Sequence, residues 1–135
     1  MSNSLGKQER LRHRSAIDEI FRTGKSISVF PYRVYFRLNE LPAVPAAANF
    51  PKTLFGVGVG KRYFKKAVDR NRIKRLTREA YRLQKHALAQ AMSTNDKNLD
   101  LFFVFTGKSL PRFEECQVAI ANALTRVQKQ ISGTA

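Results

Sequence analysis

Apolar residues in the segment 67–92 recur at spacings of three and four, which is the period of a helix with one packed side. The positions that carry this pattern are Ile73, Leu76, Ala80, Leu83 and Ala87. On the side away from this stripe, a set of cations falls within an arc of roughly 100°. They are Lys74, Arg75, Arg78, Arg82 and Lys85. The pattern predicts a long amphipathic helix with a continuous cationic ridge.

A second, shorter helix is predicted over 16–23. The Ser15 hydroxyl is placed to cap its free N–H groups, and Gly24 is expected to end it because glycine accepts the left-handed conformation found after helices. Three apolar residues share one face of this helix and predict packing on a sheet: Ile17, Ile20 and Phe21.

The last helix is expected to be capped by Ser109, with Pro111 in its first turn and two glutamates near its positive end. Its apolar stripe consists of Phe113, Cys116, Ile120, Leu124, Val127 and Ile131. Because Cys116 lies in this stripe, we expect a small buried side chain and not a reactive thiol.

The segment 28–38 alternates in polarity at its far end, which predicts a strand with two different faces. Val34, Phe36 and Leu38 form the apolar face, and Arg33, Tyr35 and Arg37 form a cationic face around an aromatic ring. The almost wholly apolar segment 99–105 predicts a strand buried inside the sheet.

The segment 54–61 predicts another strand, in which apolar residues alternate with Gly56, Gly58 and Gly60. A bare glycine face indicates either a helix packed very closely on the sheet or the close approach of a nucleic-acid backbone. The spacing is not that of a dinucleotide or P-loop motif, because the glycines alternate within the strand and do not open a helix.

Composition limits the classes of protein that the chain can form. Its 135 residues are 43% apolar and include one cysteine and two histidines. We therefore expect a single domain over 1–135, with a basic N-terminal arm at 1–14 and a Pro/Ala-rich loop at 39–53, and we exclude disulfide scaffolds and zinc modules. No apolar run approaches the ~20 residues of a membrane span, and no signal peptide follows the basic arm, so a cytoplasmic location is expected.

Charge indicates the kind of partner. The net charge is +15, and residues 1–85 hold 20 basic and 6 acidic side chains, whereas residues 86–135 hold 5 and 4. An anionic membrane surface or an acidic protein would also attract such a chain, but nucleic acid is the commonest partner of a folded domain with this charge. The first two thirds of the chain should therefore make most of the contact with the nucleic acid.

The densest cationic segment is 61–78, with nine basic residues and one acid, Asp69. Arginine predominates at its helical end and binds phosphate through two parallel hydrogen bonds. Asp69 is expected to act as a local charge partner or helix cap. The other acids are scattered, and His13 and His86 have no carboxylate cluster beside them, so the sequence favours binding over independent catalysis.

The run from Ala67 to Tyr81, which contains Arg70-Asn71-Arg72, resembles the Arg-Asn-Arg signature of the protein subunit of bacterial ribonuclease P. The resemblance extends over most of residues 10–85. It includes Arg10-Leu11, the strand through Tyr35, and the strand that precedes the run from Ala67 to Tyr81. It implies an α/β (α+β) sandwich, similar to ribosomal protein S5 domain 2, with a four-stranded mixed sheet and three helices. It also implies a left-handed βαβ crossover, where general rules predict a right-handed one.

The resemblance also implies a function. The protein would be the non-catalytic subunit of an endoribonuclease that removes the 5′ leader from precursor tRNA, with the catalytic RNA and the substrate holding Mg²⁺. No catalytic or metal-binding residue is assigned to the protein, and neither a membrane nor DNA is an expected partner. The residues expected to bind the RNA subunit are Lys61, Arg62, Lys65, Lys66, Arg70, Asn71, Arg72, Lys74, Arg75 and Arg78.

The single-stranded leader is expected in a cleft between the first helix and the open sheet face. This cleft would be lined by Ile17, Phe21 and Tyr35, with Arg33 and Arg37 beside the ring. An aromatic ring between cations is suited to a single strand, because the base stacks on the ring and the phosphates meet the cations.

Two other functions compete with this interpretation. A ribosomal-type structural RNA-binding protein would need the same charge and sheet but no leader cleft. A DNA-binding architectural protein is disfavoured because the predicted ridge is nearly all cations and lacks a base-reading face of Asn, Gln and Arg.

Overall fold

The structure is a computed structural model that describes residues 14–40, 53–93 and 97–133. The N-terminal arm up to residue 13 and the loop residues 41–52 lie outside the described residues. The elements run in the order α1 (Arg14–Thr23), β1 (Lys25–Val29), β2 (Tyr32–Glu40), β3 (Thr53–Val59), α2 (Ala67–Ser93), β4 (Lys97–Phe105) and α3 (Phe113–Gly133).

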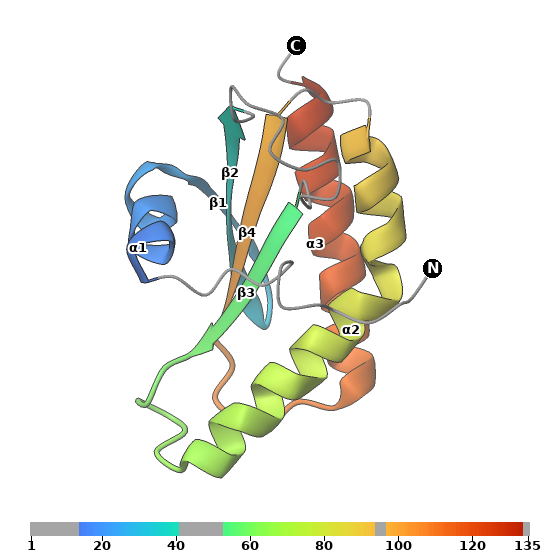
Figure 1. The fold of residues 1–135 in the computed structure, drawn as a ribbon. Coiled ribbons are helices and arrows are strands. Elements are labelled where there is room, and N and C mark those ends of the chain that lie inside the picture. Colours follow the sequence, from blue (N-terminus) through green and yellow to red (C-terminus); the bar gives the residue numbers. More distant parts are fainter. Residues whose placement is uncertain (1–13, 41–52, 94–96, 134–135) are drawn as a thin grey trace.

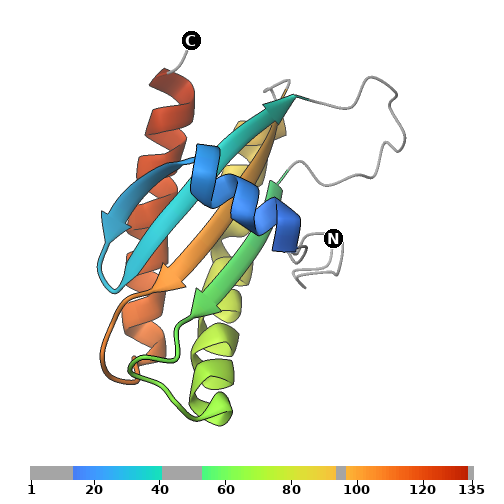
Figure 2. The same ribbon diagram turned by 90° about the vertical axis from the view of Figure 1, so that its left-hand side faces the viewer.

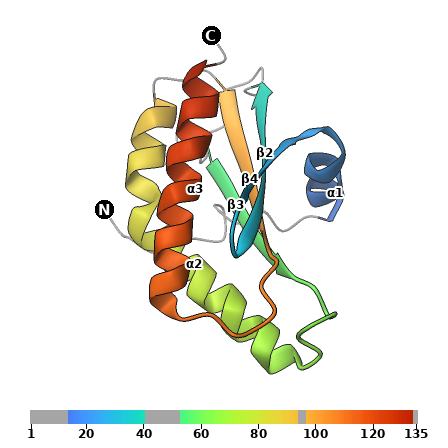
Figure 3. The same cartoon turned by 180° about the vertical axis from the view of Figure 1, so that it is seen from behind.

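The strands form one four-stranded mixed sheet in the order β1-β2-β4-β3. The pairs β1–β2 and β2–β4 are antiparallel, and β3–β4 is parallel. Helices α2 and α3 cover one face of the sheet, and α1 lies on the opposite face (Figure 1, Figure 3). This is the sandwich of four strands and three helices that was predicted.

The connection from β3 through α2 to β4 is left-handed. Figure 2 views the sheet from the α1 side, where both strands run downward, β4 lies to the left of β3, and α2 lies behind the sheet. Movement down β3, up α2 and down β4 traces a left-handed turn. The expectation drawn from the resemblance is therefore confirmed, and the general preference for right-handed crossovers does not hold here.

The main core lies between the sheet and the helices α2 and α3. The predicted apolar faces of 28–38 and 54–61 point into it, together with the stripe of α3. The Phe55 ring stacks on Tyr81 of α2, with centroids 4.0 Å apart and planes 8° apart. Cys116 is fully buried in this core, as predicted. On the other face, Ile20 and Phe102 form a smaller buried cluster under α1.

A buried polar contact also fixes α2 on the sheet. The Thr77 hydroxyl donates to the backbone oxygen of Ile73 at 2.8 Å, and its oxygen lies 2.7 Å from the Tyr32 hydroxyl. Because the Thr77 proton is used within the helix, Tyr32 is the donor to Thr77. Both hydroxyl groups are thereby satisfied within the core.

The prediction of one strand over 28–38 was wrong at its beginning. The chain forms a hairpin in which β1 ends at Val29 and β2 begins at Tyr32, with a cis peptide between Phe30 and Pro31. Residue Thr106 closes the turn against the sheet, because its backbone N–H donates to the Pro31 oxygen at 2.8 Å. The turn consists of the two apolar residues Phe30 and Pro31, so the pattern has no polar gap at this chain reversal.

The predicted stripe of α2 is correct as far as Ala80 and wrong beyond it. Leu83 and Ala87 are exposed, whereas Lys85, which was placed on the ridge, is only 9% exposed. The buried positions beyond Ala80 are Tyr81, Lys85, Leu88 and Met92. Here α2 also packs on α3, where Gln84 donates to the Gln117 backbone oxygen at 3.0 Å, and this second contact moves the buried side.

The predicted start of α3 was also wrong. The helix begins at Phe113, so Ser109 is not its cap. Instead, the Glu115 carboxylate accepts a 3.2 Å hydrogen bond from the Arg112 backbone N–H, and Cys116 N–H donates to the Arg112 oxygen. The bond from Arg112 to Glu115 is one half of a capping box, with the acid three residues after the cap.

Gly24 ends α1 as predicted, but for a different reason. It has no positive φ, and its N–H donates to the Ile20 oxygen at 2.9 Å. A Cβ at this position would lie 2.5 Å from that oxygen and 2.9 Å from the Phe36 oxygen. Gly24 is therefore needed for space, where the chain turns from the helix into the sheet. The helix itself is described from Arg14, which places the predicted cap Ser15 inside the first turn.

The bare face of β3 is occupied in part by a ring from the neighbouring strand. A Cβ at Gly58 would lie 3.1 Å from the Phe102 ring, whereas a Cβ at Gly60 would meet nothing within 4 Å. At Gly58 the close neighbour is therefore a ring of the sheet and not a packed helix, whereas the approach of a nucleic acid stays a prediction. Among the described residues, no helix has the length and hydropathy of a membrane span.

Candidate nucleic-acid interface

We call the ten residues predicted to contact an RNA subunit the basic ridge. They occupy the connection from β3 to α2 and the first three turns of α2 (Figure 1). Seven of these side chains are exposed: Lys61, Arg62, Lys65, Lys66, Asn71, Arg72 and Arg75. The half-buried members are Arg70, Lys74 and Arg78. The structure thus brings the predicted residues together on one continuous segment.

Phe64 holds the exposed cations of the connection against the body of the protein. Its side chain is buried, and its ring centroid lies 5.8 Å from that of Phe105 at the end of β4. Residues Lys61, Arg62 and Lys65 surround this anchor in sequence and remain exposed. An apolar anchor within a cationic segment fixes the cations in place without neutralising them.

Arg70 connects the ridge internally. Its Nη1 donates to the backbone oxygens of Phe64 at 2.8 Å and Lys65 at 2.9 Å. Part of its hydrogen-bonding capacity is therefore used to tie the start of α2 to the preceding connection. The sequence predicted only an RNA contact for Arg70, because the fold-back of the connection onto the helix has no signal in the residue pattern.

The predicted leader residues gather on the opposite face of the sheet. We call them the aromatic face: Ile17 and Phe21 of α1 with Arg33, Tyr35 and Arg37 of β2. The Phe21 and Tyr35 rings meet edge to face with centroids 4.7 Å apart. Phe21 remains 44% exposed, Tyr35 is half-buried, and Ile17 packs on the small cluster under α1.

The neighbouring strand β4 supports this face. In the β2–β4 register Tyr35 is opposite Phe102, and the Phe102 ring lies 5.4 Å from Phe21 in a second edge-to-face contact. Arg33, opposite Val104, is exposed, so a cation stands open beside the rings. The sequence predicted the ring and its cations correctly but did not predict Phe102 as their support.

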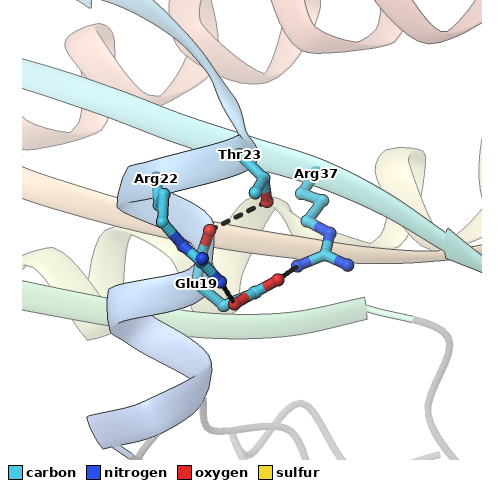
Figure 4. A network of polar contacts seen from close by, with 4 residues as sticks. All are labelled: Glu19, Arg22, Thr23 and Arg37. Atoms are coloured by element: carbon cyan, nitrogen blue, oxygen red, sulfur yellow. Dashed lines mark hydrogen bonds and ion pairs between the residues drawn. The ribbon is translucent and has the colours of Figure 1, made fainter.

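Glu19 forms a polar network with the cations of this face (Figure 4). Its carboxylate contacts the Arg22 guanidinium and lies 3.3 Å from Arg37 Nη1. The hydrogen bond from Arg22 lowers the pKa of Glu19, and Arg37 contributes in the same direction. Thr23 Oγ1 donates to the Glu19 backbone oxygen at 2.9 Å at the end of α1. Sequence reasoning missed Glu19, although the spacing of Glu19 and Arg22 is that of a helical ion pair.

The Cys116 thiol is the one free cysteine of the described residues. Burial raises the pKa of Cys116, so the thiol stays protonated near neutral pH. Within residues 14–40, 53–93 and 97–133, no group of three or more His, Cys, Asp and Glu residues is placed to hold a metal ion. The two described surfaces offer cations, the Asn71 amide and aromatic rings, which are groups suited to contact with a polyanion.

The fold and these surfaces define a class: a small basic α/β sandwich with a left-handed crossover, a cationic helix on one face and an aromatic face on the other. The model of the Ribonuclease P family matches residues 5–128. The chain belongs to this family.

Individual relatives agree with this assignment. The ribonuclease P protein component of Porphyromonas gingivalis is 35% identical over 131 residues, which cover 97% of this chain and 91% of the relative. That of Chlorobaculum tepidum is 31% identical, with 91% and 82% covered.

Solved structures show the same fold. The RNase P protein from Thermotoga maritima aligns with a TM-score of 0.63 and 27% identity, and the alignment covers 87% of this chain and 96% of that one. The Staphylococcus aureus RNase P protein, at 18% identity and a TM-score of 0.64, shares the fold, with 88% of this chain and 94% of that one covered.

Proposed function

We propose that this protein is the non-catalytic component of a ribonuclease P ribonucleoprotein that removes the 5′ leader from precursor tRNA. The basic ridge binds the catalytic RNA, and the aromatic face binds the single-stranded leader. Cleavage itself takes place on the RNA subunit. A cytoplasmic site of action fits this role in tRNA processing.

The observation that carries the proposal is the separation of the two surfaces. The aromatic face lies on the side of the sheet that carries α1, whereas the basic ridge begins where β3 leads into α2, and α2 lies on the other side (Figure 1). One molecule therefore has room for two RNA segments at once. A purely structural RNA-binding protein would need the ridge but not a second, aromatic site.

The chemistry of the aromatic face suits a single strand. Base stacking on an aromatic ring contributes ~1–3 kcal/mol per base and tolerates any base sequence. The exposed part of Phe21 and the half-buried Tyr35 supply rings, and Arg33 and Arg37 supply phosphate contacts. Such a surface binds a leader of any sequence, because every base can stack on a ring and every phosphate can contact a cation.

The contribution of the protein to cleavage is electrostatic and positional. Cations on the ridge neutralise RNA phosphates and reduce the repulsion that opposes compact folding of the RNA. Mg²⁺ supplies the Lewis acidity for hydrolysis when it is held by the RNA and the substrate. The described part of the protein offers no carboxylate cluster for the ion, so its residues bind and orient RNA.

Reconstitution tests this function. The full chain is mixed with a ribonuclease P catalytic RNA at low Mg²⁺, and the rate of leader cleavage is measured, with protein alone and RNA alone as controls. We expect strong stimulation over RNA alone and no cleavage by protein alone. Absence of stimulation would favour a structural RNA-binding role, and cleavage by the protein alone would disprove the non-catalytic assignment.

A further inference from the structure

Two connections lie side by side at one edge of the sheet. The strands β3 and β4 are adjacent and parallel, so the chain leaves both at the same edge. The connection after β3 contains Tyr63 and Phe64, and the connection after β4 contains Lys108. Phe64 packs against Phe105 at the end of β4, which holds the first connection close to the start of the second.

An exposed tyrosine lies between cations of both connections. The Arg62 guanidinium carbon is 5.4 Å from the centre of the Tyr63 ring, and Lys108 Nζ is 5.5 Å from it. The Tyr63 side chain is 46% exposed, and both cations are exposed. We call these three residues the Tyr63 cluster.

Tyr63 is not the apolar anchor of this connection. The neighbouring Phe64 already anchors this connection, with its side chain 6% exposed. Contacts between a ring and an exposed cation are weak, and they are weaker than the stacking of a base on the same ring. A nucleotide base can therefore take the place of a cation on the ring, while the flexible cation moves to the nucleotide's phosphate.

We propose that the Tyr63 cluster binds an unpaired nucleotide of the RNA subunit, with the base on Tyr63 and the phosphates on Arg62 and Lys108. This inference rests on the proposed function. The RNA subunit is the expected source because Arg62 also belongs to the basic ridge and the cluster continues it at the sheet edge. The aromatic face, by contrast, lies on the side of the sheet that carries α1. Lys108 thereby extends the interface into the last third of the chain.

Assembly with the RNA subunit tests the cluster. Binding of the full chain is measured at several salt concentrations for Tyr63→Leu, Tyr63→Phe and Lys108→Gln, with Lys129→Gln on α3 as a matched control. We expect Tyr63→Leu to weaken assembly about fivefold or more, and Tyr63→Phe to retain it because the ring is kept. Lys108→Gln should lower the salt slope by about 1. Lys129→Gln should bind as the parent protein does.

Three results would overturn the inference: Tyr63→Leu binding like the parent protein, Tyr63→Phe losing as much as Tyr63→Leu, or Lys108→Gln behaving like Lys129→Gln. Thermal unfolding is measured for each variant and should not change, since the substituted side chains are exposed. If the parent protein itself neither binds nor stimulates the RNA subunit, the proposed function fails. If it does both and the Tyr63 variants match it, only the cluster assignment fails.

Tryptophan fluorescence can report stacking at one chosen position, because the chain itself has no tryptophan. Tyr63→Trp places a single indole in the cluster, and Val118→Trp places one on the exposed side of α3 as a control. The RNA subunit should quench the indole at 63 and not at 118, and a leader oligonucleotide alone should quench neither. Equal quenching at both positions, or quenching at 63 by the leader oligonucleotide alone, would contradict the assignment to the RNA subunit.

Discussion

Glu19 places a carboxylate beside Arg37, one of the two cations of the proposed leader-binding surface. It holds Arg37 at 3.3 Å, and its lowered pKa keeps it ionised near neutral pH. A leader phosphate must therefore compete with this carboxylate for Arg37. We expect Glu19→Gln to bind leader RNA a few-fold more tightly at low salt, with a smaller gain as salt screens the charge.

Fluorescence anisotropy with a labelled leader oligonucleotide measures this effect. Glu114→Gln, which removes an exposed acid from α3, is the matched control for net charge. An equal gain in both variants would show a general charge effect and remove the specific role of Glu19.

A second prediction at the scale of single residues concerns the buried hydrogen bond from Tyr32 to Thr77. Tyr32→Phe removes that bond, while Thr77 keeps its bond to the Ile73 oxygen. The loss should lower the free energy of unfolding by roughly 0.5–1.5 kcal/mol, as measured by urea denaturation. An unchanged free energy of unfolding would show that the bond does not help to hold α2 on the sheet.

The same residue predicts a pH dependence. Burial raises the pKa of Tyr32, so its contribution to stability is complete below the unfolded value of about 10 and declines as pH rises above it. The parent protein should therefore lose more stability above pH ~10 than Tyr32→Phe does. Parallel losses in the two proteins would contradict the assignment.

The face on which a residue lies was predictable where it depends only on the position of that residue in its own strand or helix. Alternation alone placed Tyr35 between Arg33 and Arg37 on one face. Contacts between segments distant in the sequence were not predictable, because no local pattern encodes them. The Arg70 bonds to the preceding connection and the support of Phe21 by Phe102 are of this kind.

At the scale of elements, the passage from α1 into the sheet depends on Gly24. Gly24→Ala forces a Cβ against two backbone oxygens, which cannot move as a flexible side chain can. We expect a loss of about 1–3 kcal/mol in the free energy of unfolding. Gly60→Ala, where the added atom meets nothing, should be neutral or slightly stabilising. Equal effects of the two substitutions would refute the steric account.

Element types were predictable because α2 and α3 carry apolar residues at helical spacing, β3 alternates, and β4 is a short apolar run. The bounds and buried sides of these elements depended on the other elements packed against them. In the second half of α2, Tyr81 stacks on Phe55 of β3 and Gln84 contacts Gln117 of α3, and a helical wheel contains neither partner. The strand β1 was missed because the turn at Phe30 and Pro31 interrupts the alternation for only two residues.

At the scale of the whole molecule, the crossover through α2 decides where the ridge lies. With β3 and β4 parallel and α2 behind them, the cationic first turns of α2 meet the sheet edge where both strands end (Figure 2). The handedness came from family resemblance and not from residue patterns, since a pattern of apolar positions is the same for either hand. The two proposed RNA surfaces therefore follow from topology together with side-chain chemistry.

The central claim is that one surface binds the leader and another binds the catalytic RNA. The most direct test measures the affinity of the reconstituted holoenzyme for precursor tRNA with a leader and for leaderless tRNA, with the parent protein and Tyr35→Ala. The account predicts that Tyr35→Ala weakens precursor binding by about 1–3 kcal/mol and leaves leaderless tRNA unchanged. Equal weakening of both substrates would contradict it.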